Sequence, residues 1–349
     1  MWLLYGANGT TGRLFLEVWH KSGIDLPPCM LAGRSAHALQ SLAEKYNLPY
    51  QTFTLDELSQ ISLQGEPKII VNFAGPYAYT ARPWLDYCLR KGIAYMDISG
   101  EWRVLTDMYA QQEAFREAGV PVIPSAGFDT VIGEGAVYAF RQKYPQARTL
   151  HLGVYARGGY SAGTVRSALV TLPHGYFYWE RGALRPTAFS GVERRLANGK
   201  AYHFWRATLA ELVTAPAWMS DLEVLHTWIA LPPRYTRWRP LLEKVFAWQP
   251  FMDGLLRLVD SQRARLAREM DLEASTCLFV EAPEVPEWLY VASRQPYVVT
   301  AWAVLQSLQL FFREGAFPGV QSAFGRWREK LWAGIPGVQT LWKARSSPA

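Results

Sequence analysis

Cysteine is scarce in this sequence, and its few cysteines give no sign of a metal site or a disulfide framework. Cys29, Cys88 and Cys277 are far apart, and no Cys-x-x-Cys or His-x-x-x-His spacing occurs among the three cysteines and six histidines. Structural zinc sites and small secreted folds usually show such short spacings. The sequence therefore predicts no metal site and no disulfide-stapled fold.

The sequence also lacks a long apolar run and a basic block, and we expect no leader. Its longest apolar stretch, residues 297–312, holds two Gln, one Ser and one Thr, which suits a buried helix better than a membrane span of about 20 apolar residues. The net charge is +6, but Lys and Arg are spread along the chain, so we expect no nucleic-acid partner. A glycine motif begins at position 6, which leaves no space for a targeting segment and predicts a cytoplasmic protein.

Apolar and aromatic residues, by contrast, are abundant. Half of the 349 residues are hydrophobic and 15 are Trp, which is enough for a large core. Single hydrophobic cores rarely grow beyond about 250 to 300 residues. We therefore expect two domains.

Three glycines near the start, in WLLYGANGTTGR, predict a phosphate-binding turn. The apolar run at residues 2–5 indicates a strand, and apolar residues at helical spacing after the last glycine indicate a helix. Gly6 would let the chain turn sharply, Gly9 would let the backbone approach a pyrophosphate, and Gly12 would let helix and strand pack closely. The start of the helix would offer N–H groups to the phosphates. We expect a dinucleotide to bind at Gly6, Asn8, Gly9, Thr10, Thr11 and Gly12. The spacing is G-x-x-G-x-x-G, and a plain turn is the alternative.

The end of the second predicted strand indicates which dinucleotide binds. The run CMLAGRS at residues 29–35 lacks the Asp or Glu that holds the ribose 2′-hydroxyl of NAD, and it has Arg34 and Ser35 instead. A guanidinium fits a 2′-phosphate, whereas a carboxylate would repel it. The sequence therefore favours NADP(H) over NAD(H). The alternative is a solvated arginine at a strand end.

Strand-like and helix-like segments alternate up to about residue 130, which predicts an α/β fold with a Rossmann-like, doubly wound parallel sheet. A short strand is expected at 52–54, and the apolar run at 68–77 ends in small or polar residues. Pro83 and Gly92 are expected to begin and end a helix. Because ligands bind at the carboxyl ends of such strands, the cofactor-binding residues also include Asp56, Asn72, Ala74, Gly75 and Pro76.

Several segments together resemble one family. They are GANGTTG, NFAGPYAYTARPWLDYCLRKGIAYMDISGE, SAGFDTV and GTVRSAL, followed near the C-terminus by SRQPYVVTAWAVLQSLQLFF and PGVQSAFG. They are similar to the saccharopine dehydrogenase-like oxidoreductases, a group that includes the trans-acting enoyl reductases of lipid and polyketide assembly. The resemblance covers about residues 1–170, is weak in the middle, and returns from about residue 275. It implies a reductase that uses NADPH, without implying saccharopine as the substrate.

The chain departs from this family in one place. Members often continue GFD with Ser-Val-Pro-Ser-Asp, whereas this chain has Thr130-Val131-Ile132-Gly133-Glu134. The proline is missing and the acid is a glutamate. This puts the shape of the active-site rim in doubt, and not the fold.

After about residue 150 the pattern changes. The segments TLHLGVYARGG, STCLFVEAP and EWLYVASRQ predict a second, α+β domain built on a mostly antiparallel sheet. The resemblance implies that the helix near 297–312 returns to the first domain. We therefore expect a Rossmann-like NADP-binding domain of residues 1–130 plus about 295–349, and a substrate domain of about 131–294.

Residues 202–268 are rich in tryptophan and basic residues. They could be core aromatics with solvated charges, the lining for a long acyl or isoprenoid substrate, or a surface that lies on a membrane. No known nucleic-acid-binding pattern joins these arginines. The residues are Trp205, Trp218, Trp228, Trp238 and Trp248, with Arg234, Arg237, Arg239 and Lys244 among them.

A reductase needs a group that donates a proton or polarises the acceptor, and residues at strand ends are the natural candidates. No Tyr-x-x-x-Lys pair with a partnered Ser, as in short-chain reductases, occurs in the first domain. The alternative is that these carboxylates cap turns. The catalytic candidates are Tyr77, Asp97 and Asp129, and the substrate-binding candidates are Ser99, Glu101, Arg157, Tyr160 and Arg166.

The sequence thus predicts an NADPH-dependent reductase that transfers a hydride to a C=C, C=N or C=O bond of a hydrophobic, acyl or lipid-like substrate. The alternative is a non-catalytic protein that binds a dinucleotide or a lipid surface and keeps the fold. The expected partner is a small molecule, free or linked to CoA or a carrier. Peripheral membrane contact and a homodimer stay open.

Overall fold

The computed structural model describes residues 1–230 and 249–344, and the chain forms two compact units. Unit 1 contains residues 1–131 and 297–336, and unit 2 contains residues 132–296 and 337–349. One segment differs from the expected division, which placed the whole C-terminus in the first domain. Residues 337–344 belong to unit 2, because strand β16 (Gln339–Ala344) pairs along its length with β14 (Glu287–Ser293).

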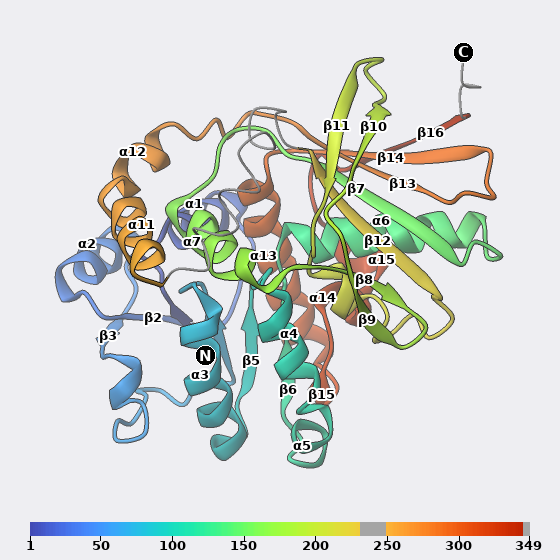
Figure 1. Ribbon diagram of the computed structural model, residues 1–349. Coiled ribbons are helices and arrows are strands. Elements are labelled where there is room, and N and C mark those ends of the chain that lie inside the picture. The colour runs from blue at the N-terminus through green and yellow to red at the C-terminus, as the bar shows by residue number, and fades with distance from the viewer. Residues whose placement is uncertain (231–248, 345–349) are drawn as a thin grey trace. The chain divides into compact units, whose positions relative to one another are not determined.

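Unit 1 is built on a parallel sheet of seven strands in the order β15-β6-β5-β4-β1-β2-β3 (Figure 1). This order confirms the Rossmann-like, doubly wound sheet. β1, β2, β4 and β5 are buried along their whole length, as expected for strands covered on both faces. β3 lies two residues earlier than predicted, and β15 was not predicted because it has only two residues. The strands are β1 (Trp2–Tyr5), β2 (Cys29–Gly33), β3 (Tyr50–Thr52), β4 (Ile69–Asn72), β5 (Ala94–Asp97), β6 (Pro121–Ile123) and β15 (Gly319–Val320).

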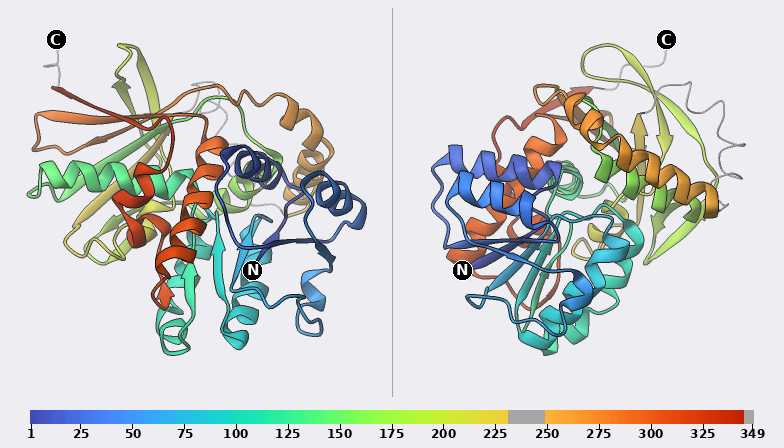
Figure 2. Two further views of the ribbon diagram at one scale, coloured as in Figure 1. Left: turned by 180° about the vertical axis from the view of Figure 1, so that it is seen from behind. Right: turned by 90° about the vertical axis from the view of Figure 1, so that its left-hand side faces the viewer.

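Helices cover both faces of this sheet (Figure 2). Trp2 of β1 packs edge-on against Phe15, with ring centroids 5.9 Å apart, and Tyr5 packs against Trp84 at 5.2 Å. Because residues 2 and 5 of a strand point to opposite faces, α1 and α3 lie on opposite faces. The helices are α1 (Thr10–Ser22), α2 (Ala36–Tyr46), η1 (Leu55–Glu57), α3 (Tyr77–Lys91), α4 (Trp102–Tyr109), α5 (Gln112–Glu117), α13 (Pro296–Glu314), α14 (Ala323–Trp327) and α15 (Glu329–Ala333).

The prediction that Pro83 begins a helix is wrong. α3 begins at Tyr77, so Pro83 lies in its second turn, and Gly92 ends the helix in the left-handed conformation as expected. Pro83 removes only the hydrogen bond to the carbonyl of Tyr79. Tyr79 has a 60% exposed side chain, so this turn of the helix lies where water can reach it.

Unit 2 contains a sheet of nine strands in the described part of the chain. Its order is β10-β11-β12-β7-β13-β14-β16, with β8 paired to β12 and β9 paired to β8. β7 and β12 are parallel and the other pairs are antiparallel, which confirms a second, mostly antiparallel sheet. The remaining strands are β7 (Thr149–Tyr155), β8 (Tyr176–Glu180), β9 (Ala183–Thr187), β10 (Gly191–Arg195), β11 (Ala201–Arg206), β12 (Val224–Ala230) and β13 (Thr276–Glu281).

One face of the unit 2 sheet packs on α6. The ring centroids of Phe140 in α6 and Trp342 in β16 lie 5.7 Å apart. The strand register places Leu289, Val280 and Leu152 on the same face as Trp342. The helices of unit 2 are α6 (Phe128–Lys143), which begins in the last residues of unit 1, α7 (Ala162–Thr171), η2 (Leu172–His174), α8 (Glu211–Thr214), α11 (Gln249–Ser261) and α12 (Arg263–Arg268).

The opposite face of this sheet carries a second buried cluster. Phe279 lies over Gly153, where an added Cβ would come within 2.0 Å of the ring. Because β7, β12 and β13 pair in register, His151, His226 and Glu281 share this face with Gly153. The cluster consists of Leu196, Phe204, Trp228, Phe279 and Tyr290.

The helix predicted near residues 297–312 is α13, which spans Pro296–Glu314 and buries ten of its residues. In residues 1–230 and 249–344, none of the helices has both the length and the apolar character needed to cross a membrane.

Candidate functional site

The predicted glycine turn has the shape of a phosphate cradle. Gly6 adopts a left-handed φ of +83°, and an added Cβ there would lie 2.8 Å from the backbone nitrogen of Ala74. At Gly12 it would lie 2.7 Å from the carbonyl oxygens of Gly6 and Ala7, so only glycine allows α1 to start this close to β1. Gly9 is the N-cap of α1, and no side chain caps the helix there. The first N–H groups of α1 are therefore left for an anion.

Arg34 and Asp56 lie beside the carboxyl end of β1. Both side chains are exposed. Burial raises the pKa of the Tyr5 hydroxyl, the charge of Arg34 lowers it, and the charge of Asp56 raises it. As cofactor-binding residues, Arg34 and Asp56 stay predictions.

The loop after β4 is held by Asn72. Its Oδ1 accepts a hydrogen bond from the backbone N–H of Ala74 (2.9 Å), and the Thr80 hydroxyl donates to the Ala74 carbonyl (2.6 Å). Gly75 is exposed and Pro76 is buried. The predicted cofactor-binding residues 72 and 74–76 therefore form a fixed loop, and Ala74 contacts the glycine turn at Gly6.

Glu101 caps the start of α3, the helix that follows β4. Its two carboxylate oxygens accept hydrogen bonds from the backbone N–H groups of Tyr77 (2.8 Å) and Ala78 (2.9 Å), the first residues of α3. The Ser99 hydroxyl in turn accepts a bond from the Glu101 N–H at 3.2 Å. Both side chains are buried. As substrate-binding candidates, Ser99 and Glu101 stay predictions, because these contacts all join them to their own loop and to α3.

A buried polar network joins the ends of β4, β5 and β6. Asn72 donates to the Tyr95 hydroxyl (3.1 Å), which donates to Asp97 Oδ2 (2.9 Å). Asp97 Oδ1 accepts from the backbone N–H groups of Ser99 (3.0 Å) and Ser125 (2.9 Å). Sequence reasoning did not single out Tyr95 or Ser125. A tyrosine in a buried strand resembles core packing, and nothing marks Ser125, whose φ is +55°.

The network explains the titration of Asp97. Burial disfavours the charged carboxylate and raises the pKa of Asp97 to about 6, against the lowering effect of its three hydrogen bonds. Tyr77 is also buried, and its hydroxyl donates to the Asn72 carbonyl at 3.3 Å. As catalytic candidates, Tyr77 and Asp97 stay predictions. Their polar atoms hold the strand ends together.

Asp129 differs from the other two catalytic candidates because its side chain is exposed. An added Cβ at Gly100 would lie 3.0 Å from Asp129 Oδ2, so the carboxylate sits against the loop after β5. Desolvation by the protein packed around it raises the pKa of Asp129 to about 6. Although part of the residue is accessible, protein surrounds the carboxylate, so it keeps its proton below about pH 6 and can serve as an acid in that range.

The residues after Asp129 depart from the family pattern without breaking the helix. α6 runs uninterrupted from Phe128 to Lys143, and Ile132 occupies the place of the family's proline. An added Cβ at Gly133 would lie 2.0 Å from Oε1 of the buried Glu211, and Trp218 Nε1 donates to Glu134 Oε2 at 3.0 Å. In this chain, Gly133 and Glu134 thus serve the packing of α8 and its following loop against α6.

The candidates of unit 2 lie after β7 and on α7. Arg157 and Tyr160 are exposed in the loop that follows β7. Arg166 of α7 forms an ion pair with Asp260 of α11. All three stay predictions as substrate-binding residues.

The tryptophan-rich middle of the chain is only partly described. Trp228 is 3% exposed and Trp205 stacks on Phe189, with ring centroids 5.0 Å apart. These two and Trp218 pack within unit 2. The other predicted residues, Trp238, Trp248, Arg234, Arg237, Arg239 and Lys244, lie outside the described residues.

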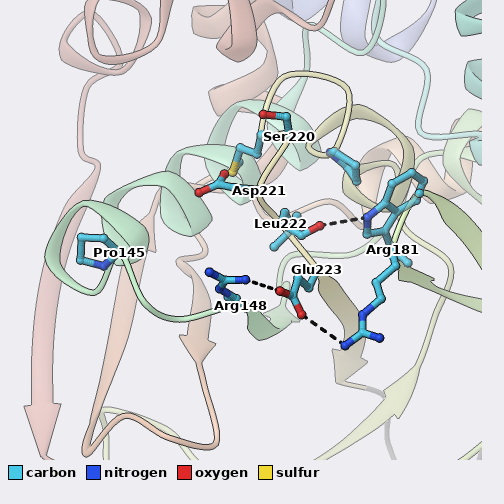
Figure 3. Close-up of a pocket in the computed structure, with 11 residues that line it drawn as sticks. Pro145, Arg148, Arg181, Ser220, Asp221, Leu222 and Glu223 are labelled. Atoms are coloured by element: carbon cyan, nitrogen blue, oxygen red, sulfur yellow. Dashed lines mark hydrogen bonds and ion pairs between the residues drawn. The ribbon is translucent and has the colours of Figure 1, made fainter.

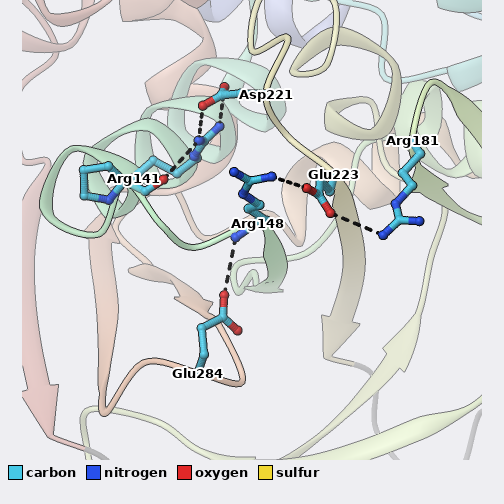
Figure 4. Close-up of polar contacts among 7 residues, drawn as sticks. Arg141, Arg148, Arg181, Asp221, Glu223 and Glu284 are labelled. Atoms are coloured by element: carbon cyan, nitrogen blue, oxygen red, sulfur yellow. Dashed lines mark hydrogen bonds and ion pairs between the residues drawn. The ribbon is translucent and has the colours of Figure 1, made fainter.

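Unit 2 also has a surface hollow of about 600 Å³ that sequence reasoning did not predict (Figure 3). Glu223 lies in it between two arginines, with one oxygen on Arg148 and the other 3.6 Å from Arg181 Nη2. Arg141 pairs with Asp221 beside it (Figure 4). Each cation there has a carboxylate partner, and Arg148 and Arg181 are mostly exposed, so their pairs contribute little binding energy.

Comparison with known proteins agrees with the cradle. Residues 2–123 match the family described as the saccharopine dehydrogenase NADP binding domain. Rv2449c of Mycobacterium tuberculosis, whose name provisionally assigns it to the trans-acting enoyl reductases, is 31% identical over 188 residues, which are 49% of this chain and 43% of that protein. The saccharopine dehydrogenase-like oxidoreductase of Homo sapiens is 30% identical over 159 residues, which are 40% of this chain and 37% of that protein. The chain thus matches less than half the length of these relatives.

The fold also matches a solved structure. Apo saccharopine dehydrogenase (L-Glu forming) from Saccharomyces cerevisiae aligns over 98% of this chain and 99% of its own, with a TM-score of 0.65 and 12% identity. At this identity the match establishes the fold alone. The predicted resemblance is confirmed over the first part of the chain: residues 2–123 match the saccharopine dehydrogenase NADP binding domain, and this match indicates NADP(H) as the cofactor.

Proposed function

We propose that the protein is an NADPH-dependent reductase that transfers a hydride to a C=C, C=N or C=O bond of a hydrophobic, acyl or lipid-like substrate. The observation that carries this proposal is the uncapped, glycine-lined start of α1 in a domain of an NADP-binding family. The enoyl reductase name of a relative supports a C=C acceptor. The resemblance to the enoyl reductases of lipid and polyketide assembly supports an acyl chain linked to CoA or a carrier.

The residues present fit NADPH. The cradle would disappear if Gly6 or Gly12 carried a Cβ, and the α1 N–H groups suit a pyrophosphate. Arg34 would hold the 2′-phosphate, and the loop at residues 72–76 would lie against the nicotinamide half. NADPH, when bound, supplies the hydride. The chain itself must then orient the acceptor and deliver a proton.

Asp129 is the proton donor in this proposal, because it is the exposed one of the three catalytic candidates. Its carboxyl must be protonated to act, so kcat/KM should fall as the pH rises above about 6. Asp129→Asn should lower kcat by about 100-fold or more and leave the Kd for NADPH unchanged. The exposed Asp107→Asn on α4 is the matched control, and steady-state kinetics over pH 5 to 8 provide the measurement. An unchanged kcat in Asp129→Asn would remove this residue from the mechanism.

The function itself is tested by binding and turnover. NADPH fluorescence should report saturable binding to the purified protein, and NADPH should be oxidised with at least one member of a panel of enoyl, imine and carbonyl acceptors. Absence of NADPH and NADP binding would overturn the proposal. Tight binding without turnover on any acceptor would instead establish the non-catalytic, dinucleotide-binding alternative.

The proposal also includes two partners, a membrane surface and a second copy of the chain. A lipid-like substrate would make peripheral membrane contact useful, and a homodimer would be compatible with the reductase. Sedimentation with liposomes and light scattering test them, and a protein that stays in the supernatant as a monomer would exclude both.

A further inference from the structure

Arg206, at the end of β11, is a half-buried arginine without a carboxylate partner in the described part of the chain. Its guanidinium carbon lies 4.7 Å from the ring centroid of Trp228. Its Nε donates to the Ser190 hydroxyl at 3.3 Å, and its Nη1 donates to His226 Nδ1 at 3.0 Å. All of these neighbours are uncharged.

A second arginine in the same sheet, Arg194, is also partly buried against a tryptophan, and a carboxylate balances its charge. Arg194 lies 5.8 Å from the ring centroid of Trp288, much as Arg206 lies against Trp228. Its Nη2, however, is 2.9 Å from a carboxylate oxygen of Glu281. Arg206 lacks this compensation, and burial lowers the pKa of its guanidinium. Keeping a partly desolvated cation without an anion costs free energy, which an anionic ligand would offset.

His226 holds the Arg206 guanidinium in place. Arginine has only N–H donors, so His226 Nδ1 must accept, which leaves the imidazole neutral with its proton on Nε2. Burial, followed by the charge of Arg206, lowers the pKa of His226 to about 4. Tyr178 stacks on this imidazole with ring centroids 4.8 Å apart. Two of the five guanidinium N–H groups of Arg206 are used, which leaves three for a ligand.

The charged and titratable groups around Arg206, His226 and Tyr178 do not balance the charge of Arg206. Glu180 of β8 accepts from the Tyr178 hydroxyl at 3.3 Å and lies 4.0 Å from Arg185. Glu281 of β13 is bound by Arg194, and His151 of β7 packs its ring 4.8 Å from that of His226. Neither carboxylate is within ion-pair distance of Arg206 in the described structure.

We propose that the guanidinium of Arg206, held in place by His226 and Ser190, forms a binding site for the carboxylate or phosphate group of a small molecule on the face of the unit 2 sheet opposite α6. The planar guanidinium matches either group through two parallel hydrogen bonds. The site uses none of the residues of the NADPH cradle, so it stands or falls independently of the reductase proposal.

NMR of the His226 imidazole tests this site directly. Inorganic phosphate and acetate are titrated separately into the full-length protein at pH 7, with sodium chloride keeping the ionic strength constant. We expect the His226 signal to shift to saturation with at least one of the two anions, with the tighter one identifying the ligand group. The bound anion should also raise the pKa of His226, because it offsets the charge of Arg206.

Variants separate a built site from general electrostatics. Arg206→Met should abolish saturation, whereas Arg185→Met on β9 removes a neighbouring charge and should bind as the wild type does. Arg206→Lys keeps the charge but loses the two parallel N–H groups of the guanidinium, so it should bind the anion at least fivefold more weakly. This variant remains informative if Arg206→Met does not fold. A linear, unsaturable shift in the wild type, or equal binding by Arg206→Lys, would overturn the proposal.

Discussion

At the scale of single residues, the proposed function makes Arg34 the residue that selects NADPH over NADH. Its exposed guanidinium lies beside the carboxyl end of β1, where a 2′-phosphate would be bound. A charge-assisted hydrogen bond contributes roughly 1.5 to 3 kcal/mol. Arg34→Ala should therefore weaken NADPH binding at least about tenfold and leave NADH binding unchanged. Fluorescence titration with both nucleotides provides the measurement.

Arg90, near the C-terminus of α3, provides a matched control for Arg34. Arg90 is exposed in the last turn of α3, away from the carboxyl ends of the strands. Arg90→Ala removes the same charge and should leave both affinities as in the wild type. If Arg34→Ala behaved like Arg90→Ala, the guanidinium would have no role in selecting the cofactor.

Asp97 gives the fold a measurable pH dependence. Its pKa is about 6 in the folded protein and about 3.9 when unfolded, so the folded state binds the proton more tightly. The stabilisation is therefore complete below about pH 4 and is lost as the pH rises through about 6. This shift corresponds to about 3 kcal/mol of unfolding free energy.

Asp97→Asn isolates this effect, because its side-chain oxygen can still accept from Ser99 and Ser125. Urea unfolding at pH 4 and at pH 7 should show that the wild type loses about 3 kcal/mol more than the variant over this interval. The exposed Asp107→Asn should follow the wild type. Parallel curves for the wild type and Asp97→Asn would show that Asp97 does not titrate as described.

At the scale of elements, the start of α3 depends on Glu101. Its carboxylate accepts from the first two N–H groups of the helix and also suits the positive end of the helix dipole. Glu101→Gln keeps the shape but can accept only through one oxygen, so it should lower the unfolding free energy by about 1 to 2 kcal/mol. Hydrogen exchange at the amides of Tyr77 and Ala78 should accelerate. The exposed Glu117→Gln is the control, and equal protection in both variants would contradict the capping role.

The elements also show which features the sequence could reveal. Buried parallel strands appear as continuous apolar runs, so β1, β2, β4 and β5 could be predicted, together with the glycine turn. The start of α3 was missed because its cap, Glu101, is 24 residues away along the chain. The two-residue strand β15 has no pattern of its own, and it forms because β6 offers a free edge.

The candidate site also contains residues that the sequence could reveal and residues that it could not. Gly6 and Gly12 could be predicted because the left-handed conformation at Gly6 and the close start of α1 at Gly12 require glycine. Tyr95 and Ser125 could not, because their role arises only when β5 and β6 lie side by side. Arg206 and His226 escaped notice for the same reason, since β11 and β12 must pair before the two side chains meet.

At the scale of the whole molecule, the C-terminal segment belongs to unit 2. β16 pairs with β14 through six residue pairs, and Trp342 packs against Phe140 and Tyr144. A chain that ends after Pro336 should therefore lower the unfolding temperature of unit 2 by several degrees, because one edge strand and its packing are lost. NADPH affinity should stay unchanged. Differential scanning calorimetry and titration measure the two effects, and a chain that ends after Ala344 is the control.

The division of the chain also bears on how the protein folds during synthesis. The polypeptide passes between the two units three times, at residues 131, 296 and 336, and unit 1 receives α13 and β15 only from its last portion. When residue 131 leaves the ribosome, β6 still has an unpaired edge. The Phe128 N–H also still lacks its acceptor, the Thr300 hydroxyl of α13, to which it donates at 3.0 Å in the folded protein. The parallel sheet of unit 1 is thus completed only after almost the whole of unit 2 has been made, although the glycine turn and the loop after β4 belong to the first 131 residues.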